Sequence, residues 1–440
     1  MAASSRVGPV QGGRVVNTSR KDKKETKVKR LVTIHSQKGG VGKTLIALYL
    51  AKKFAQKGEG GLGLRTVLID ADLTGTSLAE AVPLVSPSSA TNDFLTLEET
   101  QACFREISQP IEQGRRWPNP SQNRIKFLND VLFCDPIRYG RFIEKSEGDQ
   151  DRLFKRRHLL WRVDELRESN TPNFEFGLLR AIPSSGLPRH IAQCIPYVYR
   201  ETATEFLGRR LTDVIVSLWS GDWDGGTPFD TIIIDTPPVL TGVSHAVMGL
   251  RDSLAEHKAN SASYPKLDFE IKHTALFLSS ADLQDLTALG RRFDEILADK
   301  EPKANESVHG TGHPSEVMAP TRFLLVLNRI PQTMVELPRF AIKPGESPRV
   351  ILKDRATILQ YYSSGLELMH KASSKEMKRS TRRKNSKELP PLLADPKRTF
   401  PIQFSEDLAT VYVGELQSKK FLYSLTIPQL EDVFNGVVDG

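Results

Sequence analysis

The 440-residue sequence lacks the features that mark several classes of protein. Its three cysteines, Cys103, Cys134 and Cys194, are far apart and form no C-x-x-C pair, which argues against a disulfide framework, a thiolate zinc site and a local iron–sulfur motif. No apolar run approaches the roughly 18 residues that a membrane-crossing helix needs. Residues 1–17 lack the apolar stretch of a secretory signal. We therefore expect a cytoplasmic protein without an integral membrane segment.

The excess of positive charge is concentrated in two runs. Residues 20–30 contain seven bases and two acids, and residues 371–387 contain eight bases and one acid. Subtracting both runs from the net charge of +8 leaves the rest of the chain at −4. Such runs bind nucleic acid or an anionic membrane surface, or they are a solvated tail and a solvated loop. The sequence leaves both interpretations open.

Short apolar runs alternate with segments of helical periodicity along much of the chain. Residues 31–34 form the first run, residues 45–54 follow with apolar side chains at helical spacing, and residues 66–69 form the next run. Further strands are predicted at 176–182, 231–234, 274–278, 323–327 and 400–404, and helices at 207–214 and 283–296. Apolar strands without alternation, separated by helices, indicate an α/β fold with a mostly parallel central sheet flanked by helices.

The same pattern suggests one interrupted domain. Residues 1–28 are predicted to be a disordered basic leader, and residues 29–440 a single nucleotide-binding domain. A helical insertion is expected at 85–175, and a partly mobile basic insertion at 331–398. The first insertion is predicted to contain an amphipathic helix, and another helix is expected to begin at 406–408. The apolar positions of the amphipathic helix are Leu153, Leu159, Val163 and Leu166.

A glycine-rich turn between the first predicted strand and helix is the strongest chemical signal. Its residues are Gln37, Lys38, Gly39, Gly40, Val41, Gly42, Lys43, Thr44 and Leu45. Glycines let backbone N–H groups converge on a phosphate chain, and the start of the following helix adds its positive end. Lys43 is placed to reach the terminal phosphates, and the Thr44 hydroxyl to hold Mg²⁺. Gln37 stands where the usual motif has its first glycine.

The segment K-G-G-V-G-K-T resembles the deviant Walker A motif of the ParA/MinD family of P-loop ATPases. In that family the first lysine reaches across a dimer interface to the nucleotide of the other subunit. The resemblance therefore implies ATP and Mg²⁺ as cofactors, a homodimer formed with ATP, and catalytic roles for Lys38 and Lys43. It also implies that residues 39–45 contact the nucleotide.

Acidic residues follow two of the predicted strands. Asp70 and Asp72 come after 66–69, and alternation along a strand would place both on one face. Asp72 resembles the acid of the family's first switch segment, which lies by the attacking water and the metal, although Leu-Thr-Gly here replaces the family's Pro-Gln-Gly. Asp235 ends the strand 231–234 and resembles the Walker B acid that contacts Mg²⁺. The predicted metal site is Thr44, Asp72 and Asp235.

Asn328 and Arg329 follow the strand 323–327. An amide at the end of a strand can donate to and accept from the edge of an adenine ring. The pair resembles the adenine-contacting motif of the same family, so Asn328 is the predicted base contact.

These motifs favour a slow, partner-stimulated ATPase that acts as a dimerisation switch and positions or partitions cargo. Residues 371–387 are expected to bind DNA without sequence preference, which would associate the protein with the nucleoid. A protein activator is expected. The main alternative is a nucleotide-dependent scaffold of a defence or secretion system with little turnover. A bacterial tyrosine kinase domain shares the Asp-Thr-Pro-Pro segment but has a tyrosine-rich tail, whereas here Tyr423 is the one tyrosine after residue 412. Metal-cluster carriers and tail-anchor targeting ATPases use closely spaced cysteines, which this sequence lacks.

Overall fold

The structure is a computed structural model of the whole chain. It describes residues 27–58, 60–75, 78, 82, 84–85, 127–133, 159–163, 179–185, 188–200, 203–221, 227–240, 242–259, 269–290, 321–330, 335–336, 351–352, 358–360, 362, 397–403 and 428–439. The basic run at 371–387 and the predicted helix start at 406–408 lie outside these residues.

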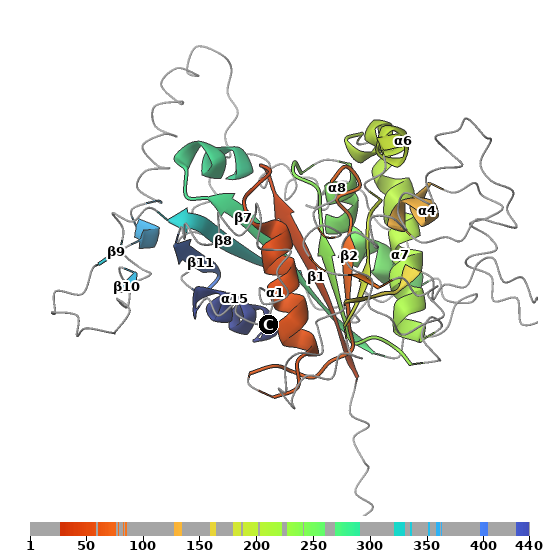
Figure 1. Cartoon of the computed structure of the whole chain (residues 1–440), viewed down its shortest axis with the longest axis horizontal. Coiled ribbons are helices and arrows are strands. Elements are labelled where there is room, and N and C mark those ends of the chain that lie inside the picture. Colours follow the sequence, from red (N-terminus) through yellow and green to blue (C-terminus); the bar gives the residue numbers. More distant parts are fainter. Residues whose placement is uncertain are drawn as a thin grey trace, which may run out of the picture.

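Nine of the described strands form one sheet (Figure 1). In spatial order they are β11 (Thr399–Gln403), β8 (Arg322–Ile330), β7 (Glu270–Ser280), β1 (Val28–Ser36), β6 (Thr231–Asp235), β2 (Thr66–Asp70), β5 (Leu179–Ile182), β4 (Trp161–Val163) and β3 (Leu84–Val85). All pairs from β11 to β5 are parallel, and β4 and β3 are antiparallel to their neighbours. The predicted fold class, a mostly parallel sheet with flanking helices, is confirmed.

One prediction about the first insertion is wrong. Val163 is predicted on an amphipathic helix with Leu159, but Trp161–Val163 is strand β4, which pairs with β5. Leu153 and Leu166 of the predicted helix lie outside the described residues. The side chains of β4 are buried, exposed and buried in turn, which is the alternation of a strand. Over so short a segment, the apolar side chains fit the spacing of a helix and the spacing of a strand equally well. Pairing with the free edge of β5 is what makes the segment a strand. The insertion therefore extends the sheet and also contributes the short helix α4 (Leu128–Leu132).

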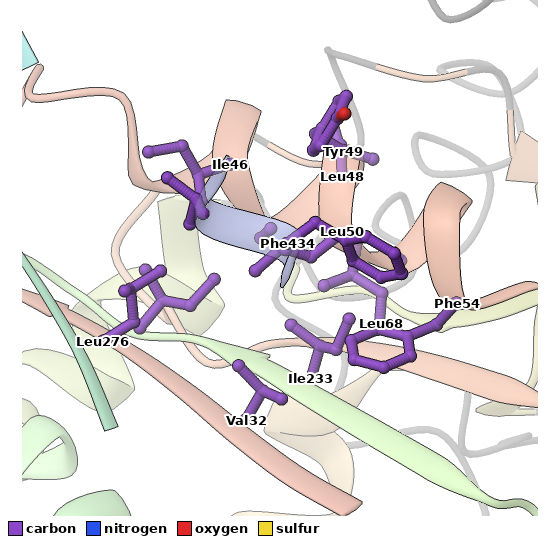
Figure 2. Packing of buried hydrophobic residues seen from close by; sticks show 14 of the residues in the cluster. Val32, Ile46, Leu48, Tyr49, Leu50, Phe54, Leu68, Ile233, Leu276 and Phe434 are labelled. Atoms are coloured by element: carbon purple, nitrogen blue, oxygen red, sulfur yellow. The ribbon is translucent and has the colours of Figure 1, made fainter. Parts of the chain in front are cut away.

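Helices α1 (Lys43–Ala55) and α15 (Pro428–Val438) cover one face of the sheet. Figure 2 shows Val32, Leu68 and Ile233 of three strands pointing toward α1. Phe54 of α1 packs edge-on against Phe434 of α15, with 5.2 Å between the ring centroids. Helix α15 is thus part of the core that holds α1 against the sheet.

The opposite face is covered by three helices that pack on β1, β2 and β6. They are α7 (Thr204–Ser220), α8 (Val243–Met248) and α9 (Leu250–Ala259), and α6 (Pro188–Val198) precedes them in the chain. The strands present alternate residues to the two faces, so Leu31 faces this layer while Val32 faces α1. A separate two-stranded antiparallel pair consists of β9 (Val335–Glu336) and β10 (Ile351–Leu352).

The end of the first basic run belongs to the fold. Strand β1 begins at Val28, and Lys29 is 3% exposed. The Lys29 ammonium lies 3.0 Å from a carboxylate oxygen of Asp230, which precedes β6. This ion pair, with a buried ammonium and a partly exposed carboxylate, ties the start of β1 to the start of its neighbour.

Candidate nucleotide-binding site

The loop between β1 and α1 has the backbone of an anion-binding turn. Gly40 and Gly42 adopt φ values of 69° and 90°, which side chains with a Cβ rarely adopt. A Cβ on Gly42 would also lie 2.9 Å from Asn328 Nδ2. Gly42 is the residue before α1 and makes no side-chain capping bond, so the loop leads directly into the positive end of the helix.

Lys43 begins α1 and points back along the loop. Its Nζ donates to Ser36 Oγ at 3.0 Å, and Ser36 Oγ in turn donates to the carbonyl of Lys38 at 2.7 Å. Burial lowers the pKa of Lys43, and the carboxyl groups of Asp235, Asp72 and Asp70 oppose that effect. Ser36 was not predicted, although its place at the end of β1 was a usable signal.

Thr44 and Asp235 meet at the carboxyl edge of the sheet. Thr44 Oγ1 donates to Asp235 Oδ2 at 2.5 Å. The other oxygen, Asp235 Oδ1, is buried and has no hydrogen-bond partner among the described residues. Burial raises the pKa of Asp235 to about 6, against the opposing effects of Lys43 and Thr44. A hydroxyl beside a carboxylate with one unpaired oxygen is a donor set that fits Mg²⁺.

Asp70 and Asp72 lie in different environments. Asp70 is fully buried at the end of β2, opposite Asp235 of β6, and accepts a hydrogen bond from Ser184 Oγ at 2.7 Å. Burial, together with the nearby carboxyl groups of Asp235 and Asp72, raises the pKa of Asp70 well above its usual range. Asp72 lies beyond the strand, is only half-buried and accepts from Thr74 Oγ1 at 3.0 Å. Asp72 is therefore the more accessible acid, while Asp70 serves as part of the support.

Lys38 lies on the outer side of the loop. Its side chain is 48% exposed, and its ammonium lies 3.6 Å from Asp282 and 4.0 Å from Asp285. Lys43 and Lys38 thus point to different surroundings, one buried toward the carboxyl groups of β2 and β6, the other toward the segment that follows β7.

Asn328 lies within β8, not after it, and contacts the loop. Its Nδ2 donates to the carbonyl of Val41 at 2.8 Å, and its Oδ1 accepts from the N–H of Arg329 at 2.8 Å. The Arg329 guanidinium donates to the carbonyl of Gly40 at 2.7 Å. The predicted adenine contact of Asn328 remains a prediction, and the contacts of Arg329 were not foreseen because they join residues far apart in the sequence.

The segment after β6 is fastened to β1. Thr236 Oγ1 donates to the carbonyl of Ile34 at 2.6 Å, and the N–H of Val239 donates to the carbonyl of Ser36 at 3.0 Å. His35 Nδ1 lies 3.0 Å from Ser244 Oγ of α8. Burial lowers the pKa of His35 well below its usual range, with smaller effects from His273 and Lys43, so the imidazole is neutral at pH 7. Thr236 Oγ1 also lies 3.3 Å from Ser244 Oγ, so the segment after β6 has polar contacts to both β1 and α8.

A family model described as "ParA: NUBPL iron-transfer P-loop NTPase" matches residues 27–103. The match includes β1, the loop, α1 and β2, so the resemblance to ParA/MinD-type P-loop ATPases is confirmed for this part of the chain. No curated protein matches the sequence.

Several solved structures are similar in fold. Apo McdA from Cyanothece is 16% identical, with a TM-score of 0.40 over 94% of this chain and 98% of that chain. A ParA family ATPase from Chlorobium tepidum is 15% identical, with a TM-score of 0.39 over 93% and 98%. The septum site-determining protein MinD from Pyrococcus horikoshii, complexed with Mg-ADP, is 17% identical, with a TM-score of 0.31 over 73% of each chain.

The described residues form neither a carboxylate, histidine or cysteine metal cluster nor a membrane-crossing helix. They contain no group of three or more His, Cys, Asp or Glu side chains arranged to hold a metal ion. None of the described helices combines the length and the apolar character needed to cross a membrane. Cys194, the described cysteine, is buried and accepts a hydrogen bond from Asn129 at 3.2 Å.

Proposed function

We propose that this protein is an ATP-binding and ATP-hydrolysing dimerisation switch of the ParA/MinD type. The observation that supports it most directly is the meeting of Lys43, Thr44 and Asp235 around a loop with left-handed glycines. The loop amides and the Lys43 ammonium bind the phosphates.

Thr44, Asp235 and Asp72 would hold Mg²⁺, which neutralises charge on the phosphates when it is bound. Asp72, the accessible acid, positions the attacking water, because an ionised carboxylate accepts a hydrogen bond from water and restricts its orientation. Asp70 is buried and bonded to Ser184, and it fixes the end of β2 from which Asp72 projects.

Hydrolysis by wild-type protein separates this proposal from the scaffold alternative. The switch predicts slow release of phosphate from Mg-ATP, raised by a protein activator. A protein that binds ATP with an ordinary affinity but releases no phosphate above a Lys43→Ala background would support the scaffold with little turnover.

Lys38 is proposed to act on the nucleotide of a second copy of the chain. Lys38→Ala should weaken the ATP-bound dimer at least roughly tenfold, the effect of about 1.4 kcal/mol, while the affinity of the monomer for ATP changes less than about twofold. Sedimentation velocity in Mg-ATP gives the dimer constant, and Lys57→Ala is the matched surface control. A loss of monomer ATP affinity as large as that of Lys43→Ala would instead place Lys38 in its own subunit's site.

The surface on which the switch works is proposed to be DNA, with residues 371–387 as the contact. This hypothesis rests on charge alone, because the run lies outside the described residues. A cytoplasmic, nucleoid-associated location follows from it.

If the run binds DNA, it does so through phosphates. Five contacts predict a slope of log K against log salt of roughly −4 to −5, from about −0.9 per phosphate, with little sequence preference. Dimerisation places two runs on one particle, so apparent affinity should rise with ATP. Fluorescence anisotropy on random duplex DNA tests this across a salt series. The variant replaces Lys378, Arg379, Arg382, Arg383 and Lys384 with alanine; tight binding by that variant would show that the run is a solvated loop.

A further inference from the structure

The end of β8 holds two consecutive peptide groups of the phosphate loop. Arg329 Nη2 donates to the carbonyl of Gly40 at 2.7 Å, and Asn328 Nδ2 donates to the carbonyl of Val41 at 2.8 Å. Asn328 Oδ1 also accepts from the backbone N–H of Arg329, which fixes the Asn328 side chain against the backbone at the end of β8. These residues lie far outside the segment 27–103 that matches the family model.

Each of these bonds determines where a backbone N–H points. In a planar trans peptide group, the carbonyl oxygen and the following N–H point in opposite directions. The bond to the Gly40 carbonyl therefore directs the Val41 N–H away from Arg329. In the same way, the bond to the Val41 carbonyl directs the Gly42 N–H away from Asn328. The Val41 and Gly42 N–H groups therefore point to the side of the loop away from the end of β8. The Gly40 and Val41 carbonyls, which would repel a phosphate, point toward Arg329 and Asn328 instead.

The backbone of Arg329 supports a specific role for its side chain. Among the described residues, Arg329 (φ 63°) and Val239 (φ 76°) are the non-glycine residues with positive φ. Both contact the loop region, since the Val239 N–H donates to the carbonyl of Ser36. Such conformations persist where the surrounding structure determines them, often at functional sites.

We infer that Asn328 and Arg329 are positioning residues for the phosphate groups of the nucleotide. They pre-organise the Val41 and Gly42 amides before any ligand arrives, so the amides need no reorientation on binding. This inference rests on the proposed nucleotide binding and deepens it. It differs from a role in reading the base, because the observed contacts are to the loop that would hold phosphates.

Binding of Mg-ATP and of magnesium tripolyphosphate, which has no base, tests the inference. Arg329→Ala should weaken the binding of both ligands by the same factor, roughly tenfold, the effect expected from losing one hydrogen bond donated by a guanidinium. Arg329→Gly, which adopts positive φ without strain, should show the same loss and separates the side chain from the backbone. Arg209→Ala, on the exposed face of α7, is the matched control for the loss of one positive charge.

A second measurement reports on the loop without ligand. Amide hydrogen exchange of residues 39–44 should be at least several-fold faster in Arg329→Ala and unchanged in Arg209→Ala. The loss of affinity for tripolyphosphate in Arg329→Ala should also persist at high salt, where long-range charge effects are screened. Weakening of ATP alone, with tripolyphosphate unchanged, would assign the pair to the base and overturn the inference. Unchanged affinity for both ligands would also overturn it while leaving the proposed function intact. A wild-type protein that binds neither ligand would overturn the proposed function and this inference together.

Discussion

Lys43→Ala should weaken ATP binding by at least roughly 100-fold. The ammonium has three N–H donors, and one of them is held by Ser36, which leaves two for phosphate oxygens. A hydrogen bond from a charged donor contributes about 1.5–3 kcal/mol, so losing two corresponds to about 3 kcal/mol or more. The alanine variant also removes the positive charge that lowers the pKa of Asp235, which disfavours a second set of negative charges at the site.

Equilibrium binding of a fluorescent ATP analogue measures this loss. Lys52→Ala is the matched control, because it removes a lysine from the last turn of the same helix, remote from the loop. This variant should bind the ATP analogue with wild-type affinity. A thermal melt of both variants without nucleotide checks that α1 remains folded. Unchanged affinity in Lys43→Ala would show that the loop is not the phosphate site.

Asp72→Ala should retain ATP binding and lose hydrolysis, so that the ATP-bound dimer accumulates. Asp72 accepts a hydrogen bond from Thr74 and acts on Lys43 through its charge, whereas the hydrogen bonds of Lys43 with Ser36 and of Thr44 with Asp235 do not involve it, so these parts of the phosphate cradle are left in place. Removing a group that orients the attacking water typically lowers the rate by about 10²–10⁴-fold. In the proposed switch, hydrolysis releases the dimer, so the lifetime of the dimer should lengthen accordingly.

Size-exclusion chromatography in Mg-ATP, with phosphate release measured on the same samples, tests this result. Asp432→Ala on the exposed face of α15 is the control for loss of a carboxylate. A dimer peak in ATP and a monomer in ADP are expected for Asp72→Ala. A monomer in every nucleotide would contradict the switch, and undiminished phosphate release would move the catalytic role to another acid.

The sequence predicted the parts of the fold that depend on local pattern. The apolar runs before Asp70 and Asp235 are strands β2 and β6, and the turn before Lys43 joins a strand to a helix. Each of these signals lies within about ten consecutive residues. The physical reason is simple: a strand buried on both faces must be apolar throughout, and a phosphate loop must contain glycine.

What the sequence could not predict depends on partners distant in the chain. Strand β4 is three residues long, and only its pairing with β5 makes it a strand. The contacts of Asn328 and Arg329 with the loop span almost 290 residues, and no local pattern encodes them. Helix α15 is a different case, because its buried residues follow helical spacing and the signal was hidden by the acidic residues between them. Those buried residues are Leu430, Val433, Phe434 and Val437.

The docking of α15 on α1 also constrains the order in which the protein can mature during synthesis. Helix α1 is complete at residue 55, yet the residues that pack beside it on the same face of the sheet, such as Leu430 and Phe434, follow about 370 residues later. At about 5–20 residues per second, that interval is roughly twenty seconds to more than a minute of translation. During that time the apolar side of α1 that α15 will cover is open to chaperones and to other nascent chains, so the phosphate loop acquires its final support only when residues 428–438 have left the ribosome.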